Sequence, residues 1–144
     1  MPLGYATPPS SMARSARRKS TRRTAEIDAA GLAELIARGG QEAALVAVGN
    51  GEIVGTCLLV ADELDAQHDV SPWLAGLVVS PAHRRNGIGA ALVRAIERTA
   101  GERGFIDLHL YTFGSESFYG GLGWEQIDRF EDGYGPSILM RRMI

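Results

Sequence analysis

The sequence predicts one α/β domain in which a mixed central sheet is flanked by helices. Segments rich in β-branched residues and leucine alternate with segments of helical periodicity, without internal repeats, and an Asn50-Gly51 pair separates two apolar runs. The length of 144 residues also fits one domain. Such a chain buries roughly two thirds of the surface that its unfolded form exposes, so it can form a core without disulfides or metal ions.

The sequence pattern of the first half of the domain predicts a helix followed by a β-hairpin. Leu32, Leu35 and Ile36 share one helical face, and the glycine pair at 39–40 ends the periodic pattern, so we expect a helix over residues 25–38. A buried strand follows over residues 43–48. Asn50-Gly51 is the strongest short signal for a tight turn into a second strand, over residues 52–61.

The second half predicts a strand and an amphipathic helix, followed by shorter elements. The strand at residues 73–80 stops before Pro81, and residues 88–103 show a helical period. We place Arg94, Glu97, Arg98 and Glu102 on the outer face of that helix. The remaining elements are a strand at 105–112, a short helix at 115–122 and strands at 124–130 and 137–142.

Charge divides the chain into a basic tail, residues 1–24, and an acidic domain, residues 25–144. The tail holds six basic residues and no acidic one, which leaves nine basic against 17 acidic residues and a net charge of −8 beyond it. It lacks periodic apolar positions, so we expect disorder there. A solvated tail, a transit-type targeting segment and a polybasic arm all fit its composition. The acidic domain argues against a specific nucleic-acid partner.

The single cysteine and the absence of long apolar runs bound the class of protein. Cys57 lies alone in an apolar stretch, which excludes a disulfide within the chain and a cysteine-based zinc site and favours a packed thiol over a nucleophile. No run approaches the roughly 18 apolar residues of a membrane span. We therefore expect a cytoplasmic protein with no metal and no membrane partner.

The most informative segment is a basic, glycine-bearing turn between the strand at 73–80 and the helix at 88–103. Gly87 and Gly89 allow an anion to approach the backbone closely, and the first N–H groups of the helix present partial positive charge. Arg84 and Arg85 add full positive charges. The spacing matches neither the dinucleotide fingerprint nor the P-loop. A diphosphate group held in another way is therefore expected.

Two motifs carry a resemblance to a known family. Arg84-x-x-Gly87-x-Gly89 follows Val79-x-Pro81, and Phe118-Tyr119-x-x-x-Gly123-Trp124 comes later in the chain. Together they resemble the GCN5-related N-acetyltransferase (GNAT) superfamily over roughly residues 25–142, and residues 71–75 resemble a bacterial-type branch with an unassigned substrate. The resemblance implies transfer of the acetyl group of acetyl-CoA directly to a primary amine, of a small cation or a peptide N-terminus. The alternative is a noncatalytic acyl-CoA-binding or interaction domain.

The same resemblance implies roles for individual residues. The amides of residues 85–89 would wrap the pyrophosphate of coenzyme A, and a kinked strand would aim the Val79 N–H at the thioester carbonyl. Tyr119 would protonate the departing thiolate, unless it is a core aromatic. The full set implied to bind the cosubstrate is Val78, Val79, Arg84, Arg85, Asn86, Gly87, Ile88, Gly89 and Ala90.

The general base and the start of the domain depart from the family pattern. The strand at 73–80 has no acidic residue, so Asp69 and His68 from the preceding loop are the candidates. His109 is either a third candidate base or a packed strand residue. The first strand of the family is absent or degenerate, and an open sheet edge there would favour a homodimer.

Overall fold

The structure is a computed structural model that describes the backbone of residues 22–27 and 31–37 and, in full, residues 42–63, 65–133 and 135–144. Within these ranges, eight strands form one sheet in the order β1-β2-β3-β4-β5-β6-β8-β7. Only β5 and β6 pair in parallel. The predicted mixed sheet with flanking helices is confirmed. The strands are β1 (Arg22–Ile27), β2 (Gly31–Ala37), β3 (Ala43–Gly49), β4 (Glu52–Val60), β5 (Trp73–Val79), β6 (Asp107–Thr112), β7 (Glu125–Asp132) and β8 (Gly135–Met143).

The helix predicted over residues 25–38 is wrong, because β1 and β2 occupy this segment. β2 pairs antiparallel with β3, with Leu32 opposite Val48, and β1 pairs antiparallel with β2. Helix propensity is a weak preference, and the edge of β3 offers backbone partners that a local periodicity does not register. β1 also crosses the expected boundary after residue 24, and residues 1–21 of the expected tail lie outside the described residues.

The elements after residue 42 agree with the prediction in order and type. β3 and β4 form the predicted hairpin, in which Asn50 and Gly51 adopt φ angles of 53° and 81°. Positive φ at both central residues is what a tight hairpin turn requires. α2 (Ile88–Glu102) and α3 (Glu116–Gly121) lie where the two helices were predicted, and a short 3-10 helix, η1 (Pro81–His83), precedes α2.

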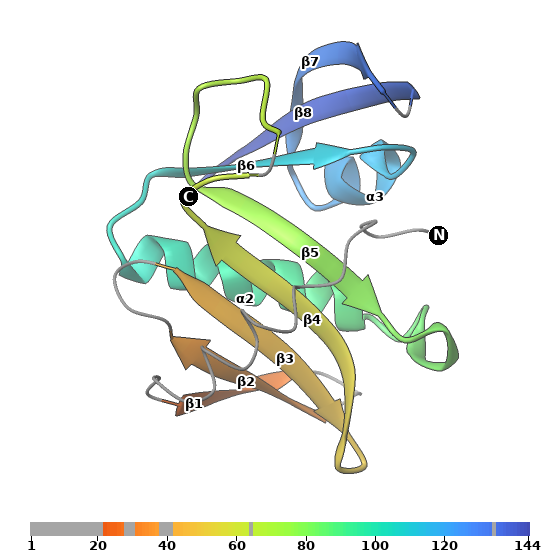
Figure 1. Ribbon diagram of the computed structural model, residues 1–144. Coiled ribbons are helices and arrows are strands. Elements are labelled where there is room, and N and C mark those ends of the chain that lie inside the picture. The colour runs from red at the N-terminus through yellow and green to blue at the C-terminus, as the bar shows by residue number, and fades with distance from the viewer. Residues whose placement is uncertain (1–21, 28–30, 38–41, 64, 134) are drawn as a thin grey trace.

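α2 lies across one face of the sheet (Figure 1) and forms the main core with it. Leu92, Val93 and Ile96 of α2 are fully buried there against Leu108 and Leu110 of β6. These apolar positions recur every three to four residues on the helix and every two on the strand. We call this side of the sheet the helix face.

A smaller apolar cluster covers the opposite side, which we call the open face. Tyr111, the residue after Leu110 on β6, packs there because successive strand residues point to opposite sides. The loop that joins β4 and β5 passes beside β6 and β8 on Figure 1. The cluster consists of Ala44, Leu58, Val60, Trp73 and Leu139, with Val70, Ala75 and Tyr111 packed against it.

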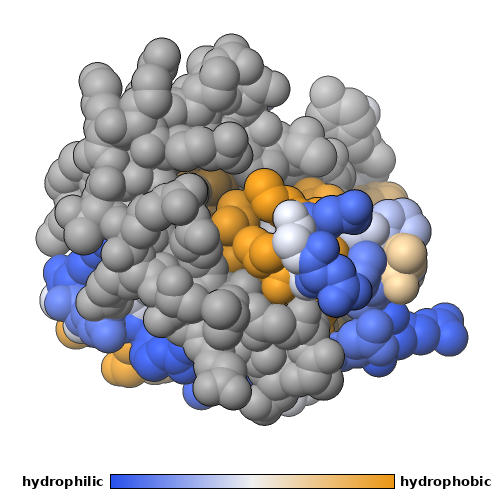
Figure 2. All heavy atoms as spheres, turned by 90° about the horizontal axis from the view of Figure 1, so that it is seen from below, coloured by the Kyte–Doolittle hydropathy of each residue, from blue (hydrophilic) through white to orange (hydrophobic). Residues whose placement is uncertain are grey.

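The surface of the described residues carries isolated apolar side chains. Figure 2, seen from the end of the sheet that holds β1 and β2, shows apolar residues gathered beside hydrophilic ones. Ile106 is the most exposed large apolar residue, at 70%. Scattered apolar exposure is ordinary for a folded domain. None of the described helices is both long and apolar enough to cross a bilayer.

Candidate active site

The glycine turn follows β5 and leads into α2, as predicted. Arg85 and Gly87 adopt left-handed φ angles of 69° and 80°, and a Cβ on Gly87 would meet nothing within 4 Å, so backbone conformation rather than space calls for glycine at 87. The first helical hydrogen bond runs from the Ala91 N–H to the Gly87 carbonyl, at 3.0 Å. The N–H groups of residues 88–90 therefore precede the helical ladder and carry its partial positive charge.

The charged residues of this turn are at the surface. Arg84, Arg85, Asn86 and Gly87 are exposed, whereas Ile88 and Gly89 are buried at the start of α2. The Nε of Arg84 donates a hydrogen bond to the Val79 carbonyl, at 3.1 Å, which fixes this side chain beside the end of β5. The turn thus combines two guanidinium groups with backbone amides, a combination that suits a phosphate or diphosphate.

β5 and β6 separate beyond a single paired position. Trp73 is paired with His109, and their junction is held by the His109 N–H, which donates to the Pro72 carbonyl at 3.1 Å. β5 continues toward the glycine turn without a pairing to β6. Its backbone groups on that side therefore face an opening in the sheet, which we call the β5–β6 opening, rather than a neighbouring strand.

Val79 directs its N–H into the β5–β6 opening. The Ser80 N–H donates to the Val54 carbonyl at 2.8 Å, and Val79 and Val78 lie opposite Gly55 and Thr56. Bonded and nonbonded pairs alternate along an antiparallel ladder, so Val78 is bonded to β4 while Val79 points away from it. The backbone groups of Val79 are therefore available at the opening, whereas those of Val78 are bonded to β4.

The expected kink in the strand is present three residues before Val79. The register between β4 and β5 shifts between Thr56 and Leu58, and Gly76 adopts a φ of 61°. The Thr56 hydroxyl donates to the Gly76 carbonyl at 3.3 Å. A bulge of this kind bends the strand and redirects the backbone groups that follow it.

Tyr119 lies in the main core at the second motif. It is 3% exposed, and its ring packs edge-on against Phe118 and Trp124 with centroid distances of 5.0 and 6.1 Å. The Tyr119 carbonyl accepts a hydrogen bond from the Trp124 N–H at 3.1 Å. Tyr119 is therefore held in place by packing, although two glycines follow it in the six-residue α3.

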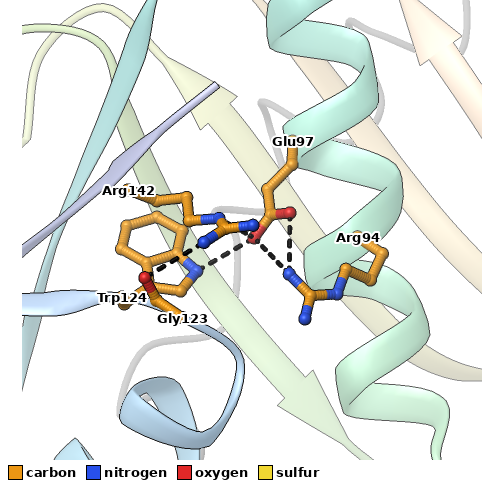
Figure 3. A network of polar contacts seen from close by, with 5 residues as sticks. All are labelled: Arg94, Glu97, Gly123, Trp124 and Arg142. Carbon is orange, nitrogen blue, oxygen red and sulfur yellow. Dashed lines mark hydrogen bonds and ion pairs between the residues drawn. The ribbon is translucent and has the colours of Figure 1, made fainter.

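Glu97 joins α2 to the second motif, a role that the sequence did not predict. Its carboxylate accepts hydrogen bonds from Trp124 Nε1 and Arg94 Nη1, each at 3.0 Å, and lies 3.8 Å from the Nε of Arg142 (Figure 3). Arg142 also donates to the Gly123 carbonyl at 3.1 Å. Glu97 is 9% exposed, so its predicted place on the outer face of the helix is wrong. The spacing with Arg94 gave the ion pair, but the partner Trp124 comes from a distant segment.

The candidate bases occupy different environments. Asp69 is exposed. His109 is 6% exposed, with Nδ1 3.2 Å from the Pro72 carbonyl, so it is the packed strand residue of the two predicted alternatives. His68 lies between Tyr111 and Asp128, within hydrogen-bonding distance of both. Asp128 and Tyr111 were not predicted, because nothing in the sequence links three residues from a loop and two strands.

Cys57 and the tryptophans are structural. Cys57 is fully buried, and burial raises the pKa of its thiol, so the packed interpretation of this residue is confirmed. Trp73 and Trp124 are 1% and 3% exposed and serve as packing anchors. Among the described residues, no group of three histidine, cysteine or acidic side chains is placed to hold a metal ion.

Comparison with known proteins relates this fold to acetyltransferases. A sequence model of the acetyltransferase (GNAT) family matches residues 11–124. No curated protein matches the chain.

Solved structures of acetyltransferases share the fold. An aminoglycoside 6'-N-acetyltransferase complexed with coenzyme A superimposes with a TM-score of 0.62 and 22% identity, over 73% of this chain and 74% of that one. An aminoglycoside 6'-acetyltransferase type Ii superimposes with a TM-score of 0.60 and 27% identity, over 73% of this chain and 70% of that one. A ribosomal-protein-alanine N-acetyltransferase from Brucella melitensis superimposes with a TM-score of 0.61 and 18% identity, over 72% of this chain and 69% of that one. The match over most of the chain, together with the glycine turn and the β5–β6 opening, places this protein in the acetyltransferase (GNAT) family, as an acetyl-CoA-dependent N-acetyltransferase.

Proposed function

We propose that the protein transfers an acetyl group from acetyl-CoA directly to the primary amine of a small cationic molecule or a peptide N-terminus. The observation that carries this proposal is the β5–β6 opening, which ends at the glycine turn. An extended ligand with a diphosphate at one end fits a turn of backbone amides that continues into an unpaired strand edge.

The residues of the turn and of β5 would hold the cosubstrate. The amides of residues 85–90 and the Arg84 and Arg85 guanidinium groups would bind the pyrophosphate. The Val79 N–H would donate to the thioester carbonyl and stabilise the negative charge that develops on its oxygen. Acetyl-CoA supplies the activated acyl group. The Val79 carbonyl already accepts a hydrogen bond from Arg84, whereas the Val79 N–H faces the β5–β6 opening.

Tyr119 would donate a proton to the thiolate that leaves. A thiol and a phenol have ordinary pKa values of about 8.5 and 10, so the transfer is uphill by roughly 2 kcal/mol in water. Tyr119 is fixed between Phe118 and Trp124, which limits the reorganisation needed before the proton moves. Its burial also fits a core residue, and the variant described below separates the two roles.

The acceptor is proposed from charge. The net charge of −8 beyond residue 24 attracts cations and raises their concentration near the protein. Two similar structures are aminoglycoside acetyltransferases and one acts on a ribosomal protein, so polycationic amines and peptide N-termini are the classes to screen first.

The test is a thioester-cleavage screen with acetyl-CoA and three acceptors: spermidine, kanamycin and a short peptide with a free N-terminus. We expect amine-dependent release of coenzyme A. Tyr119→Phe should lower kcat by about 100-fold while the affinity for coenzyme A is retained. Coenzyme A binding without turnover of any amine would instead support the noncatalytic acyl-CoA-binding alternative.

A further inference from the structure

Three side chains from distant parts of the chain form a hydrogen-bonded row on the open face. The Nδ1 of His68, in the β4–β5 loop, lies 2.7 Å from the Tyr111 hydroxyl of β6. The Nε2 of His68 lies 2.8 Å from a carboxylate oxygen of Asp128 on β7. The Phe130 ring packs edge-on against both His68 and Tyr111, with ring-centroid distances of 5.1 and 5.2 Å.

The proton positions follow from what each atom can donate. Burial raises the pKa of Tyr111, so its hydroxyl keeps its proton at neutral pH. The Gln67 N–H donates to this hydroxyl at 2.9 Å, and the backbone N–H of His68 is a second donor to it, so both oxygen lone pairs are engaged. The hydroxyl proton therefore points to Nδ1 of His68, and the histidine carries its own proton on Nε2, directed at Asp128. This is the tautomer in which a histidine can accept a proton through Nδ1.

The row lies beside the β5–β6 opening. Tyr111 comes two residues after His109, which is the residue of β6 that pairs with β5. The Tyr111 ring packs against Trp73 of β5, with 4.7 Å between the ring centroids. Ala75 of β5 packs in the same cluster. A ligand that starts at the glycine turn and follows β5 runs back toward this junction. An acceptor amine that approaches the thioester at Val79 from the β6 side would therefore lie on the same side of the opening as Tyr111.

The charges around His68 suit a cationic amine. Asp128 faces it from β7 and the neutral Tyr111 from β6, while Glu63 and Asp69 belong to the same loop. The electrostatic effect of Glu63 and Asp128 also contributes to the raised pKa of Tyr111. Arg141 of β8, opposite His109, is paired with Glu125. An incoming ammonium would replace the His68 backbone N–H on the second lone pair of the Tyr111 oxygen.

We propose that Asp128, His68 and Tyr111 form a proton relay that deprotonates the acceptor amine. This proposal rests on the proposed function. An N–H bond of the acceptor ammonium breaks and its proton bonds to the Tyr111 oxygen, while the proton of Tyr111 moves to Nδ1 of His68. The electron pair stays on the amine nitrogen, which attacks the thioester carbonyl. The imidazolium is stabilised by Asp128 and returns its proton to water through its exposed edge, 22% of the side chain.

The relay matters most for amines of high pKa. At pH 7.4 an amine of pKa about 10.4 is only about 0.1% neutral, whereas an α-amine of pKa about 8 is roughly 20% neutral. Positioned proton transfer of this type contributes about 100-fold to 10,000-fold in rate. Loss of the relay should therefore penalise alkylamines more than peptide N-termini.

The experiment measures kcat and kcat/KM from pH 6 to 10.5 for wild type, His68→Gln, Asp128→Asn and Tyr111→Phe, with spermidine and the peptide as acceptors. We expect a fall of about 100-fold at pH 7 with spermidine, a smaller fall with the peptide, and recovery toward the wild-type rate at pH 10.5. Glu131→Gln, which removes an exposed charge from the same strand as Asp128, is the matched control and should match wild type. Binding of coenzyme A and thermal melting confirm that each variant is folded.

A purely structural role for the row would lower kcat equally at every pH and for both acceptors, and that result overturns the relay while leaving the acetyltransferase function intact. Failure of the wild type to cleave acetyl-CoA with any amine overturns both proposals. An independent measurement uses the ¹⁵N shifts of the His68 ring. We expect protonation at Nε2 in the wild type and a change of tautomer population in Tyr111→Phe, whereas an Nδ1-protonated wild-type ring contradicts the relay.

Discussion

The two faces of the sheet differ in what they bury. On the helix face, α2 closes over leucine, isoleucine and valine side chains, and the buried Glu97 carboxylate accepts a hydrogen bond from the Trp124 indole. On the open face, a smaller apolar cluster carries His68, Tyr111 and Asp128 at its rim. Leu110 and Tyr111 are adjacent on β6 and belong to different faces. The comparison teaches that one strand supplies the rigid core on one side and titratable groups on the other.

The β5–β6 opening connects these two faces. Tyr119, the proposed proton donor, packs in the core of the helix face, and the proposed relay lies on the open face. An acid and a base placed on opposite sides of a planar thioester can act on the leaving sulfur and on the attacking nitrogen without competing for the same proton.

The largest effect is expected from Gly89→Glu at the glycine turn. Gly89 is buried at the first turn of α2, so a carboxylate there would face the pyrophosphate without a partner. An uncompensated charge of this kind costs about 3 to 5 kcal/mol, which corresponds to a loss of affinity for coenzyme A of about 100-fold or more. Calorimetric titration with coenzyme A measures this loss of affinity. Gly101→Glu, on the same helix but at its far end, is the matched control, and equal affinity loss in both variants would argue against the turn.

Removal of the Glu97 carboxylate tests how firmly the helix face holds the second motif. Glu97→Ala leaves Trp124 Nε1 and Arg94 without this acceptor and Arg142 without its ionic partner, and we expect a loss of about 2 to 3 kcal/mol in the free energy of unfolding. Glu97→Gln keeps an acceptor oxygen and should lose less. Urea denaturation gives the values, with Glu131→Gln at an exposed position of β7 as the control for loss of a surface charge. A stability for Glu97→Ala equal to that of the control would contradict the network.

The smallest effect is expected on the open face, from the titration of Tyr111. Its pKa in the folded protein lies above the ordinary value of about 10, so above pH 10 the unfolded chain releases this proton more readily than the folded one. The stabilisation that comes from the raised pKa of Tyr111 is present below pH 10 and is lost as pH rises through the folded pKa. Wild type should therefore lose more stability than Tyr111→Phe between pH 9 and 11. Urea denaturation of the two proteins at each pH measures these losses. An equal decline of both stabilities would falsify the prediction.

Much of the fold was predictable because its signals are local. The Asn50-Gly51 turn, the apolar period of α2 and the strand that stops before Pro81 each depend on neighbours within a few residues. The segment at 22–37 failed for the opposite reason. Leu32, Leu35 and Ile36 have a helical spacing, yet pairing with β3 gives the backbone its partners, and no local pattern reports a strand edge.

The class of site is a prediction from local sequence, whereas the contacts between its parts depend on the folded chain. Arginines and glycines between a strand and a helix predict anion binding from composition and order alone, because the N–H groups at a helix start are oriented by the helix itself. The direction of the Val79 N–H, the burial of Glu97 against Trp124 and the row from Asp128 to Tyr111 depend on strand register and on loops that bring distant residues together. These contacts cross long sequence separations, so only the folded chain specifies them.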